Sequence, residues 1–230
     1  MLAFILLQVN QAATDIATSG ADGISLKFWE LAMKGGWIMI PIFVLSLIAI
    51  FIFGDRYIAL QRASKIDTGL MNQIKINIQN GNIDAALALC RSTDKPITRM
   101  IEKGITRIGR PLNDVNAAIE NVGNLEVARL EKGLPLLASV AGGAPMIGFL
   151  GTVMGMIQAF YDMANAGNNI DVTLLSSGIY QAMVTTVAGL MVGIVAYFAY
   201  NILVSRVESL VFKMEGSTTD FMDLLNEPAS

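Results

Sequence analysis

The sequence predicts an all-α membrane protein with three transmembrane helices and long cytoplasmic helical extensions. Of its 230 residues, 53% are hydrophobic and only 15% are charged, whereas soluble domains carry about 25% charged residues. Three stretches contain no Asp, Glu, Lys or Arg, namely residues 35–54, 133–161 and 172–205. Each is long enough to supply the ~20 apolar residues that a helix needs to cross the hydrocarbon core of a bilayer.

The first crossing is expected at residues 35–54. Trp37 lies near one end and Tyr57 just past the other, as aromatic residues do at membrane interfaces. The second stretch exceeds one crossing, and Pro145 within it predicts a kink or a break, because proline removes a backbone donor and clashes with the preceding turn. We place the second crossing at residues 142–161 and the third at residues 172–200.

The distribution of positive charge predicts the orientation of these crossings. Residues 162–171 (DMANAGNNID) form a short polar turn, which makes the second and third crossings a hairpin. Twelve of the sixteen Lys and Arg residues lie between the first and second crossings, and the hairpin turn has none. The positive-inside rule places the turn in the periplasm and residues 55–141 and 201–230 in the cytoplasm of a bacterial inner membrane.

The N-terminal arm, residues 1–34, is then extracytoplasmic. Its apolar start, residues 1–9, is read either as the remnant of a signal peptide or as a loose arm. Ser25 could cap a short helix lying on the outer membrane surface.

The central region, residues 55–141, is expected to be a small layer of helices. Pro96 and Pro111 separate its segments, and IDAALALC (residues 83–90) carries a narrow apolar stripe. Asn113 or Asp114 is predicted to cap the helix that follows Pro111.

Composition excludes most enzyme classes. The chain has no histidine and a single cysteine, Cys90, so it lacks the base of Ser-His-Asp or Cys-His catalysis and the ligands of a Cys/His zinc site. We expect no cofactor, no metal and no enzymatic activity. The net charge of −3 and the lack of a Lys/Arg cluster also argue against nucleic acid as a partner.

The most informative feature of the three crossings is what they lack. None contains Asp, Glu, Lys or Arg, yet ion and proton pathways generally need such a group at depth in the membrane. If the protein moves protons, the titrating carboxylate has to come from a partner chain. Na⁺ is an alternative ion.

Small and hydroxyl residues recur in the second and third crossings. The glycines at helical spacing are expected to allow close helix packing; they are Gly148, Gly151, Gly155, Gly189 and Gly193. Ser177, Gln181 and Thr185 follow at intervals of four, with Thr186 alongside, and Thr152 lies among the glycines. These five polar residues either line an ion route or bond within and between helices.

Two long motifs resemble a known family. APMIGFLGTVMGMIQAF (residues 144–160) resembles the second-helix signature of the MotA/TolQ/ExbB proton-channel family, and GIYQAMVTTVAGLMVGIVAYFAYN (residues 178–201) resembles its third-helix signature. KGGWIMIPIFVLSLIAI, from residue 34, and GNIDAALALC, residues 81–90, are similar to the ExbB branch.

The resemblance implies a homo-oligomer, a pentamer embedded in membrane lipids around a central pore. It implies an ExbD/TolR-type single-pass partner inside the pore, whose aspartate titrates, and energy transfer to an outer-membrane process through a TonB-type protein. Thr152 and Thr186 match the family threonines that line the ion route. ExbB and TolQ usually have glutamate where this chain has Gln181. The alternatives are a TolQ- or MotA-like stator that drives another process, or a passive membrane scaffold.

Overall fold

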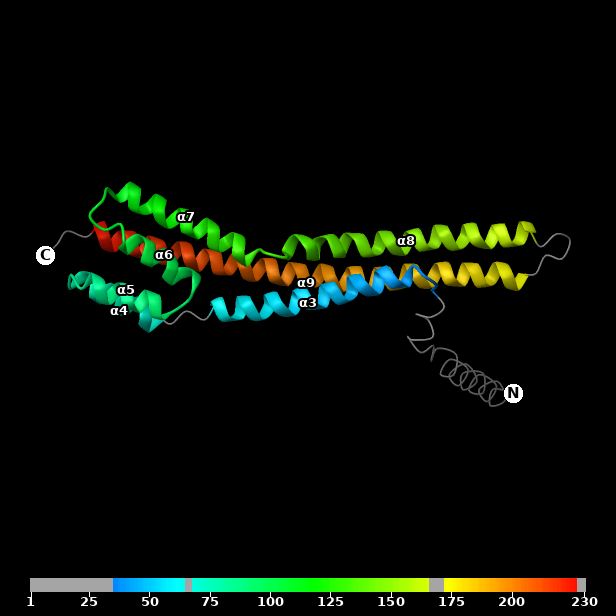
Figure 1. The fold of residues 1–230 in the computed structure, drawn as a ribbon, viewed down its shortest axis with the longest axis horizontal. Helices are drawn as coiled ribbons and strands as arrows, with labels where there is room; N and C mark the ends of the chain where they lie inside the picture. Colours follow the sequence, from blue (N-terminus) through cyan, green and yellow to red (C-terminus); the bar gives the residue numbers. More distant parts are fainter. Residues whose placement is uncertain (1–34, 65–67, 166–171, 227–230) are drawn as a thin grey trace, which may run out of the picture. The chain divides into compact units, whose positions relative to one another are not determined.

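The computed structural model describes residues 35–64, 68–165 and 172–226, and every regular element within them is a helix. Figure 1 shows α3 (Met39–Ser64), α4 (Thr68–Gln79), α5 (Ile83–Ser92), α6 (Pro96–Ile105), α7 (Leu112–Leu130), α8 (Leu134–Asn165) and α9 (Val172–Asn226). The predicted all-α class is confirmed. The N-terminal arm, including the cap expected at Ser25, and most of the hairpin turn lie outside the described residues.

Three helical stretches of the described chain are long and apolar enough to cross a membrane. They lie in α3, in Leu112–Asn165, which includes α8, and in Leu175–Asn226, within α9. The three-span prediction is confirmed. Large apolar side chains such as Phe51, Met146 and Phe198 are more than half exposed in the single chain. Such exposure suits a surface that faces lipid or other chains, because a soluble monomer rarely shows so large an apolar area to water.

Of the two alternatives predicted at Pro145, a kink or a break, the break does not occur. The helix α8 runs without interruption from Leu134 to Asn165, with Pro145 inside it. Proline removes one backbone hydrogen bond, whereas a break in the membrane would leave several polar backbone groups without partners. Continuing the helix is therefore the less costly arrangement.

The described chain divides into two compact units. The hairpin unit contains residues 35–44 and 144–191, and therefore the facing parts of α8 and α9. The helical-layer unit contains residues 45–143 and 192–226, and therefore α4 to α7.

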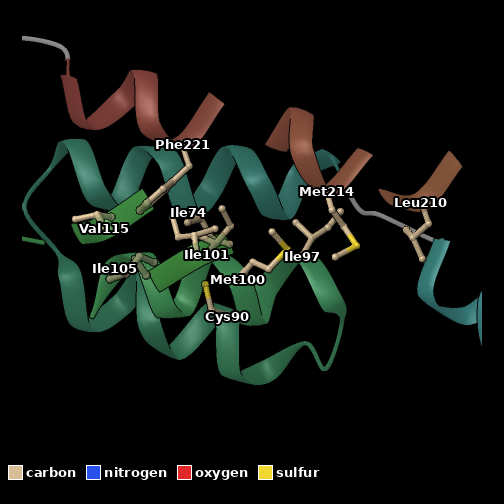
Figure 2. Close-up of a cluster of buried hydrophobic side chains, with 12 residues drawn as sticks. Ile74, Cys90, Ile97, Met100, Ile101, Ile105, Val115, Leu210, Met214 and Phe221 are labelled. Atoms are coloured by element: carbon tan, nitrogen blue, oxygen red, sulfur yellow. The ribbon is translucent and has the colours of Figure 1, made fainter. Parts of the chain in front are cut away.

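The helical-layer unit has a core built from five helices. Figure 2 shows Ile74 of α4, Cys90 of α5, Ile101 of α6 and Phe221 of α9 gathered in one cluster, which Ile119 of α7 joins. Ile101 and Ile119 are fully buried, and burying such a side chain stabilises the fold by roughly 1.5–3 kcal/mol.

The buried residues of α9 in the helical-layer unit follow the spacing of a coiled coil. Its buried positions recur at alternating intervals of three and four, or at their sum of seven; they are Leu203, Val207, Leu210, Met214, Phe221 and Leu224. This spacing keeps one apolar stripe of the helix turned toward its neighbours. The stripe is continuous from a second cluster, which includes Leu60 and Leu137, to the cluster of Figure 2.

The start of α7 differs from the sequence-based expectation. Pro111 occupies the N-cap position and the helix begins at Leu112, so the prediction that Asn113 or Asp114 caps it is wrong. The backbone angles of Pro111 lead directly into the helix. Asp114 then lies in the first turn, where a carboxylate interacts favourably with the helix dipole.

Candidate functional site

The candidate site lies where α8 and α9 pack against each other in the hairpin unit (Figure 1). Glycines let the two backbones approach. A Cβ atom on Gly189 would lie 2.6 Å from the carbonyl oxygen of Ala144 and 2.9 Å from the Cα of Gly148. A Cβ atom on Gly148 would lie 2.9 Å from the carbonyl oxygen of Thr185. Only glycine fits at such contacts, because backbone atoms cannot move aside as a flexible side chain can.

The same packing continues toward the hairpin turn. A Cβ atom on Gly155 would lie 3.0 Å from the Cβ of Ala182 and 3.2 Å from the carbonyl oxygen of Gly178. At Gly151 an added Cβ would lie 2.7 Å from the Cβ of Thr185. The glycines at 148, 151, 155 and 189 thus form one tightly packed seam, which we call the glycine seam.

Two hydroxyl groups meet within the glycine seam. The side-chain oxygens of Thr152 and Thr186 are hydrogen-bonded to each other, and either can be the donor. The hydroxyl of Thr186 also lies 3.2 Å from the carbonyl oxygen of Gly148, and that of Thr152 lies 3.4 Å from the same oxygen. A third long contact of 3.4 Å joins Thr152 to the carbonyl oxygen of Ala182. Both threonines are half-buried in the single chain.

Thr185 lies next to this pair but has a different environment. Its side chain is only 1% exposed, and its hydroxyl donates to the carbonyl oxygen of Ala182 at 2.8 Å, which is the local bond typical of threonine in membrane helices. Its carbon atoms pack on Gly151. These contacts match a packing residue.

Gln181 lies on another side of α9, away from the threonine pair. Its amide nitrogen lies next to Gly36, where an added Cβ would meet it. Gly36 has a φ of 68°, a conformation that glycine adopts without strain. Gln181 itself is half-buried.

An open groove of about 770 Å³ runs along this side of the hairpin unit. Gln181, Ser177 and Thr185 line it from α9, Gln158 and Asp162 line it from α8, and Trp37 lines it from the segment before α3. Thr152 and Thr186 do not line it.

The structure therefore separates the five polar residues into two groups. Thr152 and Thr186 form one hydrogen-bonded pair inside the glycine seam, whereas Ser177, Gln181 and Thr185 line the groove, with Thr185 almost fully buried. Gly193 is buried too, but it belongs to the helical-layer unit.

Sequence reasoning missed Gly178 and Ala159. A Cβ atom on Gly178 would lie 2.5 Å from the Cβ of Ala159 and 3.2 Å from the carbonyl oxygen of Gly155. Gly178 lies four residues before Ala182, and Ala159 lies four residues after Gly155, so the small-xxx-small pattern extends to both. Counting alanine together with glycine as a small residue would have revealed them.

The chemistry open to the five polar residues is limited to neutral hydrogen bonding. Hydroxyls donate and accept, and a glutamine amide does both through separate atoms, but none of them titrates near neutral pH. Among the residues that the structure describes, no cluster of three His, Cys, Asp or Glu side chains could hold a metal. The site can assist a charge that another group carries.

One protein family matches more than half of this chain. Residues 92–216 match the MotA/TolQ/ExbB proton channel family. The putative biopolymer transport protein ExbB homolog of Methanothermobacter thermautotrophicus is 26% identical over 187 residues, which cover 81% of this chain and 66% of the relative. The chain thus spans about two thirds of that relative's length.

Two further relatives differ in how much of them is matched. The biopolymer transport protein ExbB of Neisseria meningitidis serogroup A is 26% identical over 216 residues, covering 86% of this chain and 96% of the relative. The Tol-Pal system protein TolQ of Haemophilus influenzae is 34% identical over 106 residues, 46% of each chain. The family match includes the glycine seam and the threonine pair and spans more than half of the sequence. The chain is a member of the MotA/TolQ/ExbB proton channel family.

Proposed function

We propose that this protein is the channel-forming subunit of an inner-membrane motor driven by an ion gradient. In this proposal five copies surround a pore, and an ExbD/TolR-type single-pass protein inside it carries the titrating aspartate. The motor energises transport across the outer membrane through a TonB-type protein. H⁺ is the expected ion, and Na⁺ is the alternative.

The observation that carries the proposal is the hydroxyl pair of Thr152 and Thr186 in a membrane hairpin without ionisable groups at its centre. A charge in the middle of a bilayer costs several kcal/mol unless polar groups or water stabilise it. The paired hydroxyls and the nearby carbonyl oxygen of Gly148 supply such groups. A partner's carboxylate could therefore ionise beside them at a lower cost than in lipid.

The orientation belongs to the same proposal. The basic residues between α3 and α8 favour a cytoplasmic helical layer and a periplasmic hairpin turn.

The test is co-purification followed by an ion-flow measurement. The chain would be expressed with the single-pass membrane protein encoded beside it, and the untagged complex would be purified and placed in vesicles. Proton uptake after an imposed membrane potential should be abolished by an Asp→Asn change in the partner's membrane segment, while the complex stays intact. A chain that recruits no such partner, or a complex that takes up no protons, would favour the passive scaffold. Full uptake by the Asp→Asn variant would contradict the role proposed for the partner's aspartate.

The partial match to TolQ supports a second candidate. A TolQ-like subunit would have the same architecture and ion route but would drive a different envelope process. The two are separated by which deletion strain the chain restores: growth on iron complexes that need outer-membrane transport supports the first, and restored resistance to detergents supports the second.

A further inference from the structure

A basic pocket lies within the helical-layer unit, between the end of α3, the α5–α6 connection and α7. Its volume is about 530 Å³, which is in the size range of small-molecule sites. The five cationic side chains that line it are Arg56, Arg62, Lys95, Arg99 and Arg129. Two carboxylates, those of Asp94 and Glu126, line it too, and a third, Asp55, pairs with Arg56. Among the described residues at this pocket, cationic side chains therefore outnumber carboxylates.

Ion pairs hold three arginines of this pocket in place, namely Arg56, Arg99 and Arg129. The side chain of Glu126 is only 5% exposed, and it accepts hydrogen bonds from Arg99 at 3.0 Å and from Arg129 at 2.5 Å. Asp94 holds the other end of the Arg99 guanidinium at 2.9 Å. Because these contacts fix the cations before any ligand arrives, little ordering entropy would be lost on binding.

One donor of the pocket is left without a partner. The Nε atom of Arg99 is buried and has no hydrogen-bond acceptor among the described residues. Buried donors in native proteins are almost always satisfied, so each exception calls for a physical cause such as an absent ligand. An anionic oxygen entering the pocket would supply the missing acceptor.

The position of the pocket along α3 indicates where that oxygen comes from. Arg56 and Arg62 lie two and eight residues past the charge-free stretch that ends at residue 54. At 1.5 Å per residue they are about 3 and 12 Å beyond the hydrocarbon core, which places them at and just below the lipid headgroups. Small and apolar residues of α3 and α7 complete the lining, namely Ala59, Leu60, Ala63 and Leu130.

We propose that this pocket binds the phosphate of an anionic phospholipid from the adjacent leaflet. The cations contact the phosphate oxygens, and the apolar side chains contact the glycerol and the first acyl carbons. Basic pockets at the cytoplasmic ends of transmembrane helices bind anionic headgroups for these reasons. The inference depends on α3 crossing the membrane and does not depend on ion flow.

The test compares two double variants that lose the same charge. Arg62→Gln with Lys95→Gln removes two of the cations that line the pocket. Lys103→Gln with Arg110→Gln removes two cations that do not line the pocket. Binding of phosphatidylglycerol and of phosphatidylcholine to the detergent-solubilised complex would be measured by native mass spectrometry, together with the unfolding temperature of each variant.

The wild type and the control pair should bind phosphatidylglycerol equally. The Arg62→Gln, Lys95→Gln pair should bind it roughly tenfold or more weakly, because each lost cation near an anionic surface contributes on the order of a few-fold. Phosphatidylcholine binding should not change. Equal phosphatidylglycerol binding by both pairs would overturn the proposal.

Two other outcomes would also overturn the lipid assignment. If millimolar inorganic phosphate displaces the lipid from the wild type, the site serves a soluble phosphate. If the pocket variant binds the lipid normally but no longer retains the single-pass partner, the pocket is a protein-binding surface. Failure of ion flow with lipid binding intact would concern only the proposed motor function.

Discussion

Among single residues, Thr152 and Thr186 are the two whose hydroxyl groups meet within the glycine seam between α8 and α9. Replacing both with valine keeps their shape and removes the hydroxyls. We expect the complex to assemble and proton uptake to fall about three- to tenfold or more, since a hydrogen bond typically contributes about 1 kcal/mol net.

The matched control for this change is Thr219→Val. Thr219 is on α9 as well, and its hydroxyl makes the local bond to the carbonyl oxygen of Glu215 at 3.1 Å. This variant should keep wild-type uptake. Wild-type uptake in the Thr152→Val, Thr186→Val variant would leave helix packing as the role of the pair.

Cys90 supplies a residue-scale prediction about pH. Burial, with a smaller contribution from the negative charge of Glu102, raises the pKa of the Cys90 thiol from 9.0 to about 11. Between pH 9 and 11 the unfolded chain releases this proton while the folded chain retains it. The thiol's contribution to stability is therefore complete below pH 9 and is lost as the pH rises toward 11.

The measurement is denaturant unfolding at pH 8, 9 and 10 for the wild type and for Cys90→Ala. The wild type should lose more stability over this range than the variant does. Alkylation of the folded wild type at pH 8.5 should also be slow and should accelerate greatly in denaturant, because only the thiolate reacts. Equal pH slopes for the two proteins would show that the thiol is not perturbed.

At the scale of helices, the glycine seam can be tested by replacing one glycine of α9 and one of α8 with alanine. At Gly189 an added Cβ would meet the backbone of α8, whereas at Gly142 it would meet nothing within 4 Å. Gly189→Ala should lower the unfolding temperature of the solubilised chain by several degrees, as overpacking by one methyl group typically costs about 1–3 kcal/mol. Gly142→Ala should be neutral or slightly stabilising, since alanine favours helix by up to about 1 kcal/mol. Equal behaviour of the two variants would mean that α8 and α9 do not pack through this seam.

The elements also show what could be predicted from sequence. Charge-free stretches predicted the three membrane helices, because an apolar run of about 20 residues without a charge matches the thickness of a bilayer and is typical of a membrane span. The spacing of Gly148, Gly151 and Gly155 predicted a packing face on α8. The break expected at Pro145 and the cap expected at Asn113 or Asp114 were local rules that tertiary and membrane context overrode.

The candidate site was predictable in composition and less so in arrangement. Ser177, Gln181 and Thr185 follow at intervals of four, which indicated one polar face, yet Thr185 is buried on Gly151 and Gln181 contacts Gly36. Helical spacing gives the direction of a side chain on its own helix. It does not say which other segment will lie there, and the segment before α3 carried no signal for its contact with α9.

For the whole molecule, the orientation in the membrane is the property to test. In a Cys90→Ala background, Arg110→Cys places a thiol in the exposed α6–α7 connection and Asn165→Cys places one at the end of α8. A membrane-impermeant thiol reagent should label the cysteine at 165 in intact spheroplasts, and the one at 110 only after permeabilisation. The reverse pattern would mean that the helical layer is periplasmic and that the positive-inside rule fails here.

The hydrogen bond between Thr152 and Thr186 allows the two hydroxyl groups to reorient when a charge comes near. Either oxygen can donate, so the bond has two arrangements that differ only in the position of a proton. A negative charge arriving on one side would favour the arrangement that turns a hydroxyl hydrogen toward it, and its neutralisation would remove that preference. The heavy atoms of the glycine seam need not move. The glycine seam would then keep its backbone fixed while the local dipole of the two hydroxyls reverses. The dielectric response to the charge would consist of a shift of two protons.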